Sequence, residues 1–205
     1  MQTGQFGKSF AEKLLAASAS STDKFLTDAD YQQAANLLGI EMAIVRAIVE
    51  VESSGRGFLK DGRPKILFER HIFYHETKGA HANLHPDICN AKSGGYLGNE
   101  AEWKRLEVAL RLDRKAALMS ASWGLGQIMG FNHEIVGYAN VDDFVQAMHN
   151  SEAKQLAAMM TFLKANHLIP ALRNRDWKTI ARFYNGEGGV GVYDIKLAKA
   201  YSRYA

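Results

Sequence analysis

The sequence predicts a mainly α-helical (α+β) fold, a bundle of helices with one small β-hairpin or sheet. Three observations predict this class. Apolar residues recur at helical spacing along most of the chain. Only three prolines interrupt these patterns in 205 residues. A single short apolar stretch, residues 65–68, is typical of a strand, and no pattern indicates a parallel sheet.

The predicted elements follow in order along the chain. Residues 1–25 indicate an N-terminal helical arm and a linker, and residues 26–205 indicate one folded domain. Thr27 is expected to cap the first helix of this domain because acidic residues fill the turn after it. Residues 56–64 carry an Asp-Gly turn and predict a hairpin or loop. Helices are expected over residues 27–38, 41–52, 70–76, 100–120, 142–166, 169–174, 176–185 and 193–203.

Composition and charge exclude several classes of protein. The 25 basic and 22 acidic side chains give a net charge of +3, without the run of like charges found in nucleic-acid-binding arms. No apolar run reaches the roughly 20 residues of a membrane helix, and residues 10–19 are too interrupted for a signal peptide. The single cysteine, Cys89, suits a reducing compartment. We therefore expect a cytoplasmic monomer without nucleic-acid partner or stable membrane insertion.

Glu52 is the first candidate for catalysis. It lies four residues after Ile48, on the apolar face of the helix predicted over residues 41–52. Burial there would raise the pKa of the carboxyl and keep it protonated at neutral pH, as a general acid acting on a glycosidic oxygen requires. The alternative is a helix-end carboxyl that turns into solvent. Glu50 is expected on the polar face, paired with Arg46.

The segment from Ser122 to Gly130 is rich in glycine. Glycines let the backbone approach another backbone or a ligand closely, and Gln127 offers both a donor and an acceptor among apolar neighbours. The spacing of the glycines does not match a phosphate-binding loop. Two interpretations stay open at this point: the wall of a sugar cleft, or a tight crossing of two helices.

Tyr184 and Asn185 end the helix predicted over residues 176–185. Tyr184 shares a face with Trp177 and Ile180, so its hydroxyl is expected to point inward and to need a partner. Asn185 stands directly before a glycine, a pair that also serves as an ordinary helix C-cap.

Histidines suggest a rival kind of site. His71, His75, His81 and His85 form two i, i+4 pairs, and Cys89 follows four residues later. Such pairs can hold zinc, as in an amidase, although no H-E-x-x-H motif occurs. The other interpretation is a loop with polar histidines, of which His71 lies next to the cleft. On that interpretation the protein needs neither metal nor cofactor.

The order of these segments resembles the goose-type lysozyme and lytic transglycosylase superfamily, and longer strings resemble the N-acetylmuramidase family of phage endolysins. The resemblance covers residues 27–204. It rests on VESSG at residues 51–55, Gly57-Phe58, RPKILFERH at residues 63–71, ASWGLGQIMG at residues 121–130 and RFYNG at residues 182–186. The continuation of the last string into Glu187-Gly188-Gly189 departs from the pattern.

The resemblance implies a lysozyme-like fold that cleaves the β-1,4 bond between N-acetylmuramic acid and N-acetylglucosamine in peptidoglycan. Glu52 would take the place of the catalytic acid, and the small sheet would lie beside the cleft. Glycan strands would be bound by Ser122, Gly124, Gln127, Tyr184, Asn185 and His71. Such a lysin would stay in the host cytoplasm until a partner such as a holin opens the membrane. The positive charge would favour approach to an anionic wall.

Glycoside hydrolysis also needs a group that activates water or stabilises the cation. Glu69, at the end of the predicted strand, is the first choice, with Asp61 and Glu187 as further options. Glu69 could instead brace the cleft through an ion pair with Arg70 or another arginine. Without a second carboxylate, the 6-hydroxyl of muramic acid would attack and leave the anhydro-sugar of a lytic transglycosylase. A zinc amidase and a non-catalytic wall-binding protein are the remaining alternatives.

Overall fold

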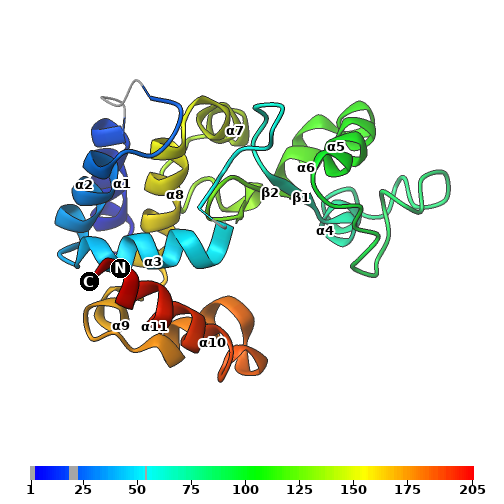
Figure 1. The fold of residues 1–205 in the computed structure, drawn as a ribbon. Helices are drawn as coiled ribbons and strands as arrows, with labels where there is room; N and C mark the ends of the chain where they lie inside the picture. The colour runs from blue at the N-terminus through cyan, green and yellow to red at the C-terminus, as the bar shows by residue number, and fades with distance from the viewer. Residues whose placement is uncertain (1–2, 19–22, 54) are drawn as a thin grey trace.

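The computed structural model describes residues 3–18, 23–53 and 55–205. Two groups of helices are joined by a small sheet: α4, α5 and α6 lie on one side of β1 and β2, and the other labelled helices lie on the other side (Figure 1). The helices are α1 (Thr3–Ser18), α2 (Asp28–Leu38), α3 (Met42–Ser53), α4 (Arg70–Glu76), α5 (Glu100–Leu112), α6 (Arg114–Met119), α7 (Val141–Asn150), α8 (Glu152–Ala165), α9 (Ile169–Arg173), α10 (Trp177–Asn185) and α11 (Tyr193–Tyr204). The strands are β1 (Ile66–Phe68), β2 (Ala121–Trp123) and β3 (Ile128–Met129), and short 3-10 turns cover Gly130–Asn132 and Glu187–Gly189.

Local capping explains where several helices begin. Thr27 and Asp30 form a reciprocal capping box at the start of α2, as the sequence predicts. Helical structure is predicted over residues 100–120 and 142–166, but each stretch forms two helices and not one. Asp113 breaks the first and caps α6, and Ser151 breaks the second and caps α8. Both residues have an extended backbone, and their side chains accept a hydrogen bond from the new helix.

The sheet is antiparallel, with the order β1–β2–β3. Leu67 of β1 pairs with Ser122 of β2, and Ser122 pairs in turn with Met129 of β3. The prediction of a strand at residues 65–68 is therefore confirmed for residues 66–68. The interpretation of the glycine-rich segment as a helix crossing is wrong, because this segment forms the hairpin β2–β3. Residues 56–64 form the predicted loop, which a bridge between Phe58 and Pro64 closes.

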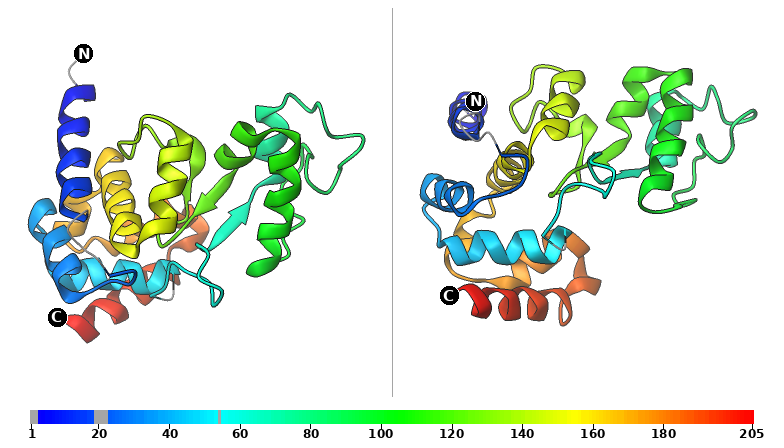
Figure 2. Two further views of the ribbon diagram at one scale, coloured as in Figure 1. Left: turned by 90° about the horizontal axis from the view of Figure 1, so that it is seen from above. Right: turned by 45° about the horizontal axis from the view of Figure 1, so that its top comes forward.

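Two hydrophobic clusters hold the fold together. One surrounds the sheet and includes Trp123, Phe68 and Phe144, and the other lies among α2, α3, α8 and α11. Helix α1 packs beside α8 (Figure 2), and its Phe10 and Leu14 belong to the second cluster. The predicted linker lies largely outside the described residues, because residues 19–22 are not among them.

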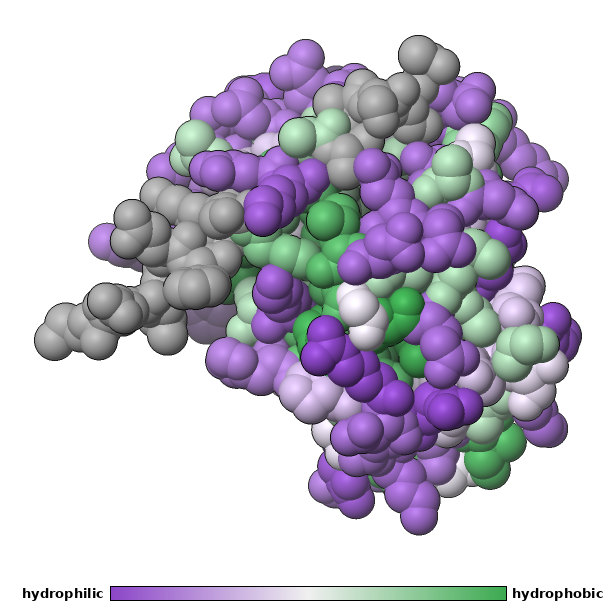
Figure 3. Space-filling model, turned by 90° about the vertical axis from the view of Figure 1, so that its left-hand side faces the viewer, coloured by the Kyte–Doolittle hydropathy of each residue, from purple (hydrophilic) through white to green (hydrophobic). Residues whose placement is uncertain are grey.

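The surface on the side of α1 and α2 is mainly hydrophilic, with hydrophobic side chains gathered near its centre (Figure 3). Nearby, Leu37, Ile169 and Pro170 line a shallow cavity together with Lys164 and Arg173. Among the described residues, no helix has both the length and the apolar character needed to cross a membrane.

Candidate active site

Glu52 lies in the last turn of α3, where the spacing of apolar residues predicts a buried carboxyl. Its Oε1 atom is buried and has no hydrogen-bond partner among the described residues. Burial raises the pKa of this carboxyl to about 8, since a charge there would lose its hydration without a compensating partner. The side chain is therefore protonated at neutral pH and can donate a proton.

Glu50, two residues earlier, has a different environment. Its carboxylate forms an ion pair with Arg203 and accepts a hydrogen bond of 2.7 Å from the hydroxyl of Tyr204. The predicted pair with Arg46 is wrong, because Arg46 binds Asp28 at 2.6 Å instead. Helical spacing alone could not show that α11 packs across this face of α3.

An open cavity of about 290 Å³ lies against Glu52. It brings together the end of α3, strand β1, the residue before α5 and the turn between β2 and β3. Its lining comprises Glu52, Ser53, Leu59, Lys65, Ile66, Leu67, Asn99, Gly124 and Gln127. Of the predicted site residues, Glu52, Gly124 and Gln127 therefore share one cavity.

Gln127 is held by three hydrogen bonds within the protein. Its Nε2 donates to the carbonyls of Gly124 at 2.9 Å and Lys65 at 3.3 Å, and its Oε1 accepts from the Ser122 hydroxyl at 2.9 Å. Gln127 also has a φ of 45°, which is unusual for a residue other than glycine. Ser122 is buried behind Gln127. In this arrangement Ser122 orients Gln127, and Gln127 links the hairpin turn to the residue that precedes β1.

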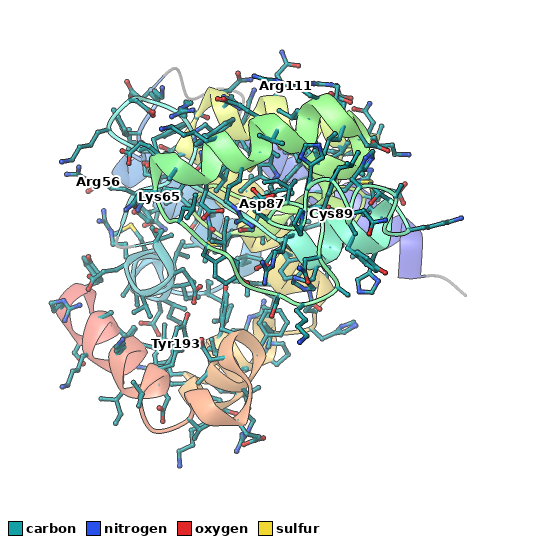
Figure 4. The ribbon with its side chains drawn as sticks, turned by 90° about the vertical axis from the view of Figure 1, so that its right-hand side faces the viewer. Arg56, Lys65, Asp87, Cys89, Arg111 and Tyr193 are labelled. Carbon is teal, nitrogen blue, oxygen red and sulfur yellow. The ribbon has the colours of Figure 1, made fainter. Side chains whose placement is uncertain are left out.

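Tyr184 lies close enough to Glu52 for the two groups to influence each other. Burial first, and the charge that Glu52 can carry second, raise the pKa of the Tyr184 hydroxyl well above its usual value. The ring of Tyr184 packs on Tyr193, with 5.7 Å between the ring centroids. Figure 4 shows Tyr193 next to α3, which is seen end-on there. Asn185, the last residue of α10, is exposed.

Glu69 and His71 lie together just beyond β1. One oxygen of Glu69 accepts a 2.8 Å hydrogen bond from the Tyr96 hydroxyl and lies 3.2 Å from Nδ1 of His71. The His71 contact is close but is not aligned as a hydrogen bond. The bracing interpretation expected an arginine partner, but Arg70 donates to the carbonyls of Lys92 and Ser93. Glu69 thus has partners, but they are a tyrosine and a histidine.

Two residues of the cavity were not singled out by the sequence analysis. Lys65 donates from Nζ to the carbonyl of Ser53 at 2.8 Å, which places a cation at the C-terminal end of α3. Asn99 precedes α5 with a φ of 46° and does not cap that helix with its side chain. A lysine beside an apolar strand and an asparagine at a helix start were visible signals, but both are common on ordinary surfaces.

The histidines do not converge. His81 stacks on Phe73, and Cys89 is buried beside the Thr77 hydroxyl. Within residues 3–18, 23–53 and 55–205, no group of three or more His, Cys, Asp or Glu side chains could hold a metal ion.

A mostly helical chain with a small antiparallel sheet beside a cavity that holds a buried carboxyl has a lysozyme-like fold. The chain belongs to the N-acetylmuramidase family, whose model matches residues 41–205. It is similar to the crystal structure of a Burkholderia AP3 phage endolysin, with 45% sequence identity and a TM-score of 0.84. The similarity covers 91% of this chain and 74% of that one. No curated protein matches the sequence.

Proposed function

We propose that this protein is a peptidoglycan hydrolase that cleaves the β-1,4 bond between N-acetylmuramic acid and N-acetylglucosamine, with Glu52 as general acid. The observation that carries the proposal is the buried, unpartnered carboxyl of Glu52 beside an open cavity. A carboxyl with a pKa of about 8 keeps its proton at neutral pH until the leaving oxygen takes it. Membership of the N-acetylmuramidase family supports the choice of substrate.

In the reaction, Glu52 gives its proton to the glycosidic oxygen while the bond from C1 of muramic acid to that oxygen breaks. The N-acetylglucosamine fragment leaves with a new hydroxyl, and C1 becomes an oxocarbenium-like centre. We assign substrate contacts to Gly124, Gln127, Tyr184 and Asn185 in the cleft, with Ser122 and His71 behind them. Water then attacks C1 and gives a proton to a second carboxylate, which leaves a reducing muramic acid end.

Glu69 is the proposed second carboxylate that orients this water. It is 16% exposed, and the Tyr96 hydroxyl and His71 hold it in place. It does not line the cavity around Glu52, however, and of the described residues in that lining Glu52 alone is acidic. This observation favours a second candidate function, in which the 6-hydroxyl of muramic acid attacks C1 and an anhydro-sugar forms without water.

We also propose the biological setting of a phage endolysin, because the similar structure is a phage endolysin. The protein would accumulate in the host cytoplasm, and a holin-type partner would release it to the wall. A zinc amidase or a non-catalytic wall-binding protein would need other chemistry than the Glu52 carboxyl supplies.

Mass spectrometry of digested peptidoglycan tests the proposal. Reducing muramic acid ends are expected, whereas anhydro ends, lighter by one water, would indicate the transglycosylase. Glu52→Gln should fold normally and lose about 10²- to 10⁴-fold in rate. Full activity in that variant, or release of free peptides by the wild type, would contradict the assignment.

A further inference from the structure

A second open cavity, of about 800 Å³, adjoins the one at Glu52. The two cavities share Leu59, Lys65 and Asn99 in their linings, so they form one continuous depression. The residues to which glycan contacts are assigned above do not line this second cavity. The second therefore offers room for a group attached to the glycan.

Three of the five charged side chains that line this second cavity are basic. The side chains of Arg56 and Lys60 are exposed and make no hydrogen bond or ion pair with any described residue. Lys65 uses one of its three protons on the Ser53 carbonyl. Burial lowers the pKa of Lys65, the charge of Glu152 opposes this shift, and the nearby charge of Arg56 adds to it. Figure 4 shows Arg56 and Lys65 together beside the end of α3.

Two acidic side chains share this lining, so the five charged groups leave a net charge of +1. Glu152 is buried, and its two oxygens accept hydrogen bonds from the backbone N–H groups of Leu26 at 3.0 Å and Gly57 at 2.7 Å. Glu100 is exposed and takes part in none of the ion pairs. A ligand with carboxylates would gain charge-assisted hydrogen bonds from unpaired groups, and the planar fork of an arginine suits a carboxylate best.

The cavity also has an apolar part. Phe25 is 60% exposed and packs edge-on against Phe58, with 6.2 Å between the ring centroids. Exposed aromatic surface next to unpaired cations suits a ligand that carries both methyl groups and carboxylates.

We propose that this second cavity binds the short acidic peptide that peptidoglycan carries on muramic acid, while the glycan strand lies at Glu52. The proposal rests on the proposed function, because only then is the occupant of the first cavity a glycan with such a branch. Arg56 and Lys60 bind the peptide carboxylates, and Lys65 and Asn99 lie at the junction of the two cavities.

The test compares two soluble substrates: peptide-bearing glycan chains, and the same chains after their peptide carboxylates have been converted to amides. The wild type should cleave the charged chains with the higher kcat/KM. In the double variant Arg56→Ala/Lys60→Ala this preference should fall by about fivefold, as expected for the loss of two partly solvated charge contacts. Both replaced side chains are exposed and unpaired, and thermal unfolding checks that the variant folds.

The matched control is Arg111→Ala/Lys115→Ala. These two exposed cations lie on α5 and α6, and their loss changes the net charge equally. Figure 4 shows Arg111 well away from Arg56 and Lys65. An equal fall in preference in this control would mean that net charge alone acts, and would overturn the proposal. So would a wild type that cleaves both substrates equally. A wild type that produces neither reducing nor anhydro muramic ends would instead overturn the proposed function, and the second cavity with it.

Discussion

Glu50 and Glu52 are two residues apart on α3, yet they have opposite environments. Glu50 is bound by Arg203 and Tyr204, whereas the buried Oε1 of Glu52 has no partner among the described residues. The spacing of apolar residues in the sequence was enough to predict which of the two is buried, because a helix places residues four apart on one face. It could not predict the partner of Glu50, which comes from the other end of the chain.

Burial of Glu52 has a consequence for stability. The folded protein keeps a proton on this carboxyl up to a pH of about 8, whereas the unfolded chain loses it near 4.5. The folded state therefore binds more protons between these values, and stability falls as the pH rises through this window. We predict that at pH 8.5 the free energy of unfolding of Glu52→Gln exceeds that of the wild type by a few kcal/mol, at about 1.4 kcal/mol per pKa unit. Urea denaturation measures this difference.

Near pH 4 this advantage of Glu52→Gln should vanish, because the carboxyl is then protonated in the folded state and largely so in the unfolded chain. The control is Glu50→Gln, which changes a partly exposed, ion-paired carboxyl of the same helix. A pH-dependent gain of equal size in the control would contradict the prediction, since it would not depend on burial.

Glu69 can be tested by separating its charge from its hydrogen bond. In Glu69→Gln the side-chain carbonyl can still accept from the Tyr96 hydroxyl, so the local structure is retained while the charge is lost. We predict normal thermal unfolding and a loss of about 10²-fold or more in hydrolysis, the usual contribution of a general base. Tyr96→Phe removes the hydrogen bond and keeps the charge, so it should lose less. Unchanged hydrolysis in Glu69→Gln would contradict the role of Glu69 as the base, whereas a shift of the products to anhydro ends would indicate intramolecular attack by the muramic acid hydroxyl.

At the scale of elements, the hairpin β2–β3 depends on close packing against α8. The backbone N–H of Leu125 in its turn donates to the Gln155 side chain at 2.9 Å, and that side chain donates in turn to the Met148 carbonyl. The glycine spacing predicted a close approach of backbone here. This spacing could not indicate whether the partner would be a helix, a strand or a sugar, because glycine has no side chain whose chemistry would suit one of them.

Gly124 tests this packing. It has a φ of +67°, and a Cβ there would lie 2.6 Å from the side chain of Gln155. Gly124→Ala should therefore lower the free energy of unfolding by more than about 1 kcal/mol, measured by urea denaturation. Gly188→Ala is the matched control, because a Cβ at Gly188 meets nothing within 4 Å and its φ is not positive. An equal loss in both variants would show that the close approach to α8 is not the cause.

Helix boundaries show the same limit of local reasoning. The apolar pattern correctly predicted helical structure across residues 100–119 and 142–165, but it continued through Asp113 and Ser151. An N-cap occupies a single residue, so it hardly disturbs the periodicity on either side of it. The capping signal was present in the sequence, since both residue types are favoured N-caps.

At the scale of the whole molecule, the candidate site combines segments that are far apart in sequence. Glu52 ends α3, Lys65 precedes β1, Asn99 precedes α5, and Gly124 and Gln127 flank a turn. The segments that carry Glu52, Gly124 and Gln127 could be recognised separately because their residue types are unusual at their spacing, whereas Lys65 and Asn99 could not. Their convergence depends on the antiparallel register of the sheet and on the packing of α8 behind the hairpin, and neither follows from a local pattern.

The N-terminal helix gives the last prediction. The family match begins at residue 41, yet Leu14 of α1 is 3% exposed in the cluster that also holds Ile44 and Ile48 of α3. If α1 is part of this core, Leu14→Ala should lower the free energy of the main unfolding transition by about 2–5 kcal/mol. The neighbouring, exposed Glu12→Ala should change it by no more than about 0.5 kcal/mol. A helix that served only as an arm would unfold separately, and Leu14→Ala would then leave the main transition of the catalytic core unmoved. A single shifted transition would mean that α1 unfolds together with α8 and with α3, the helix that carries Glu52.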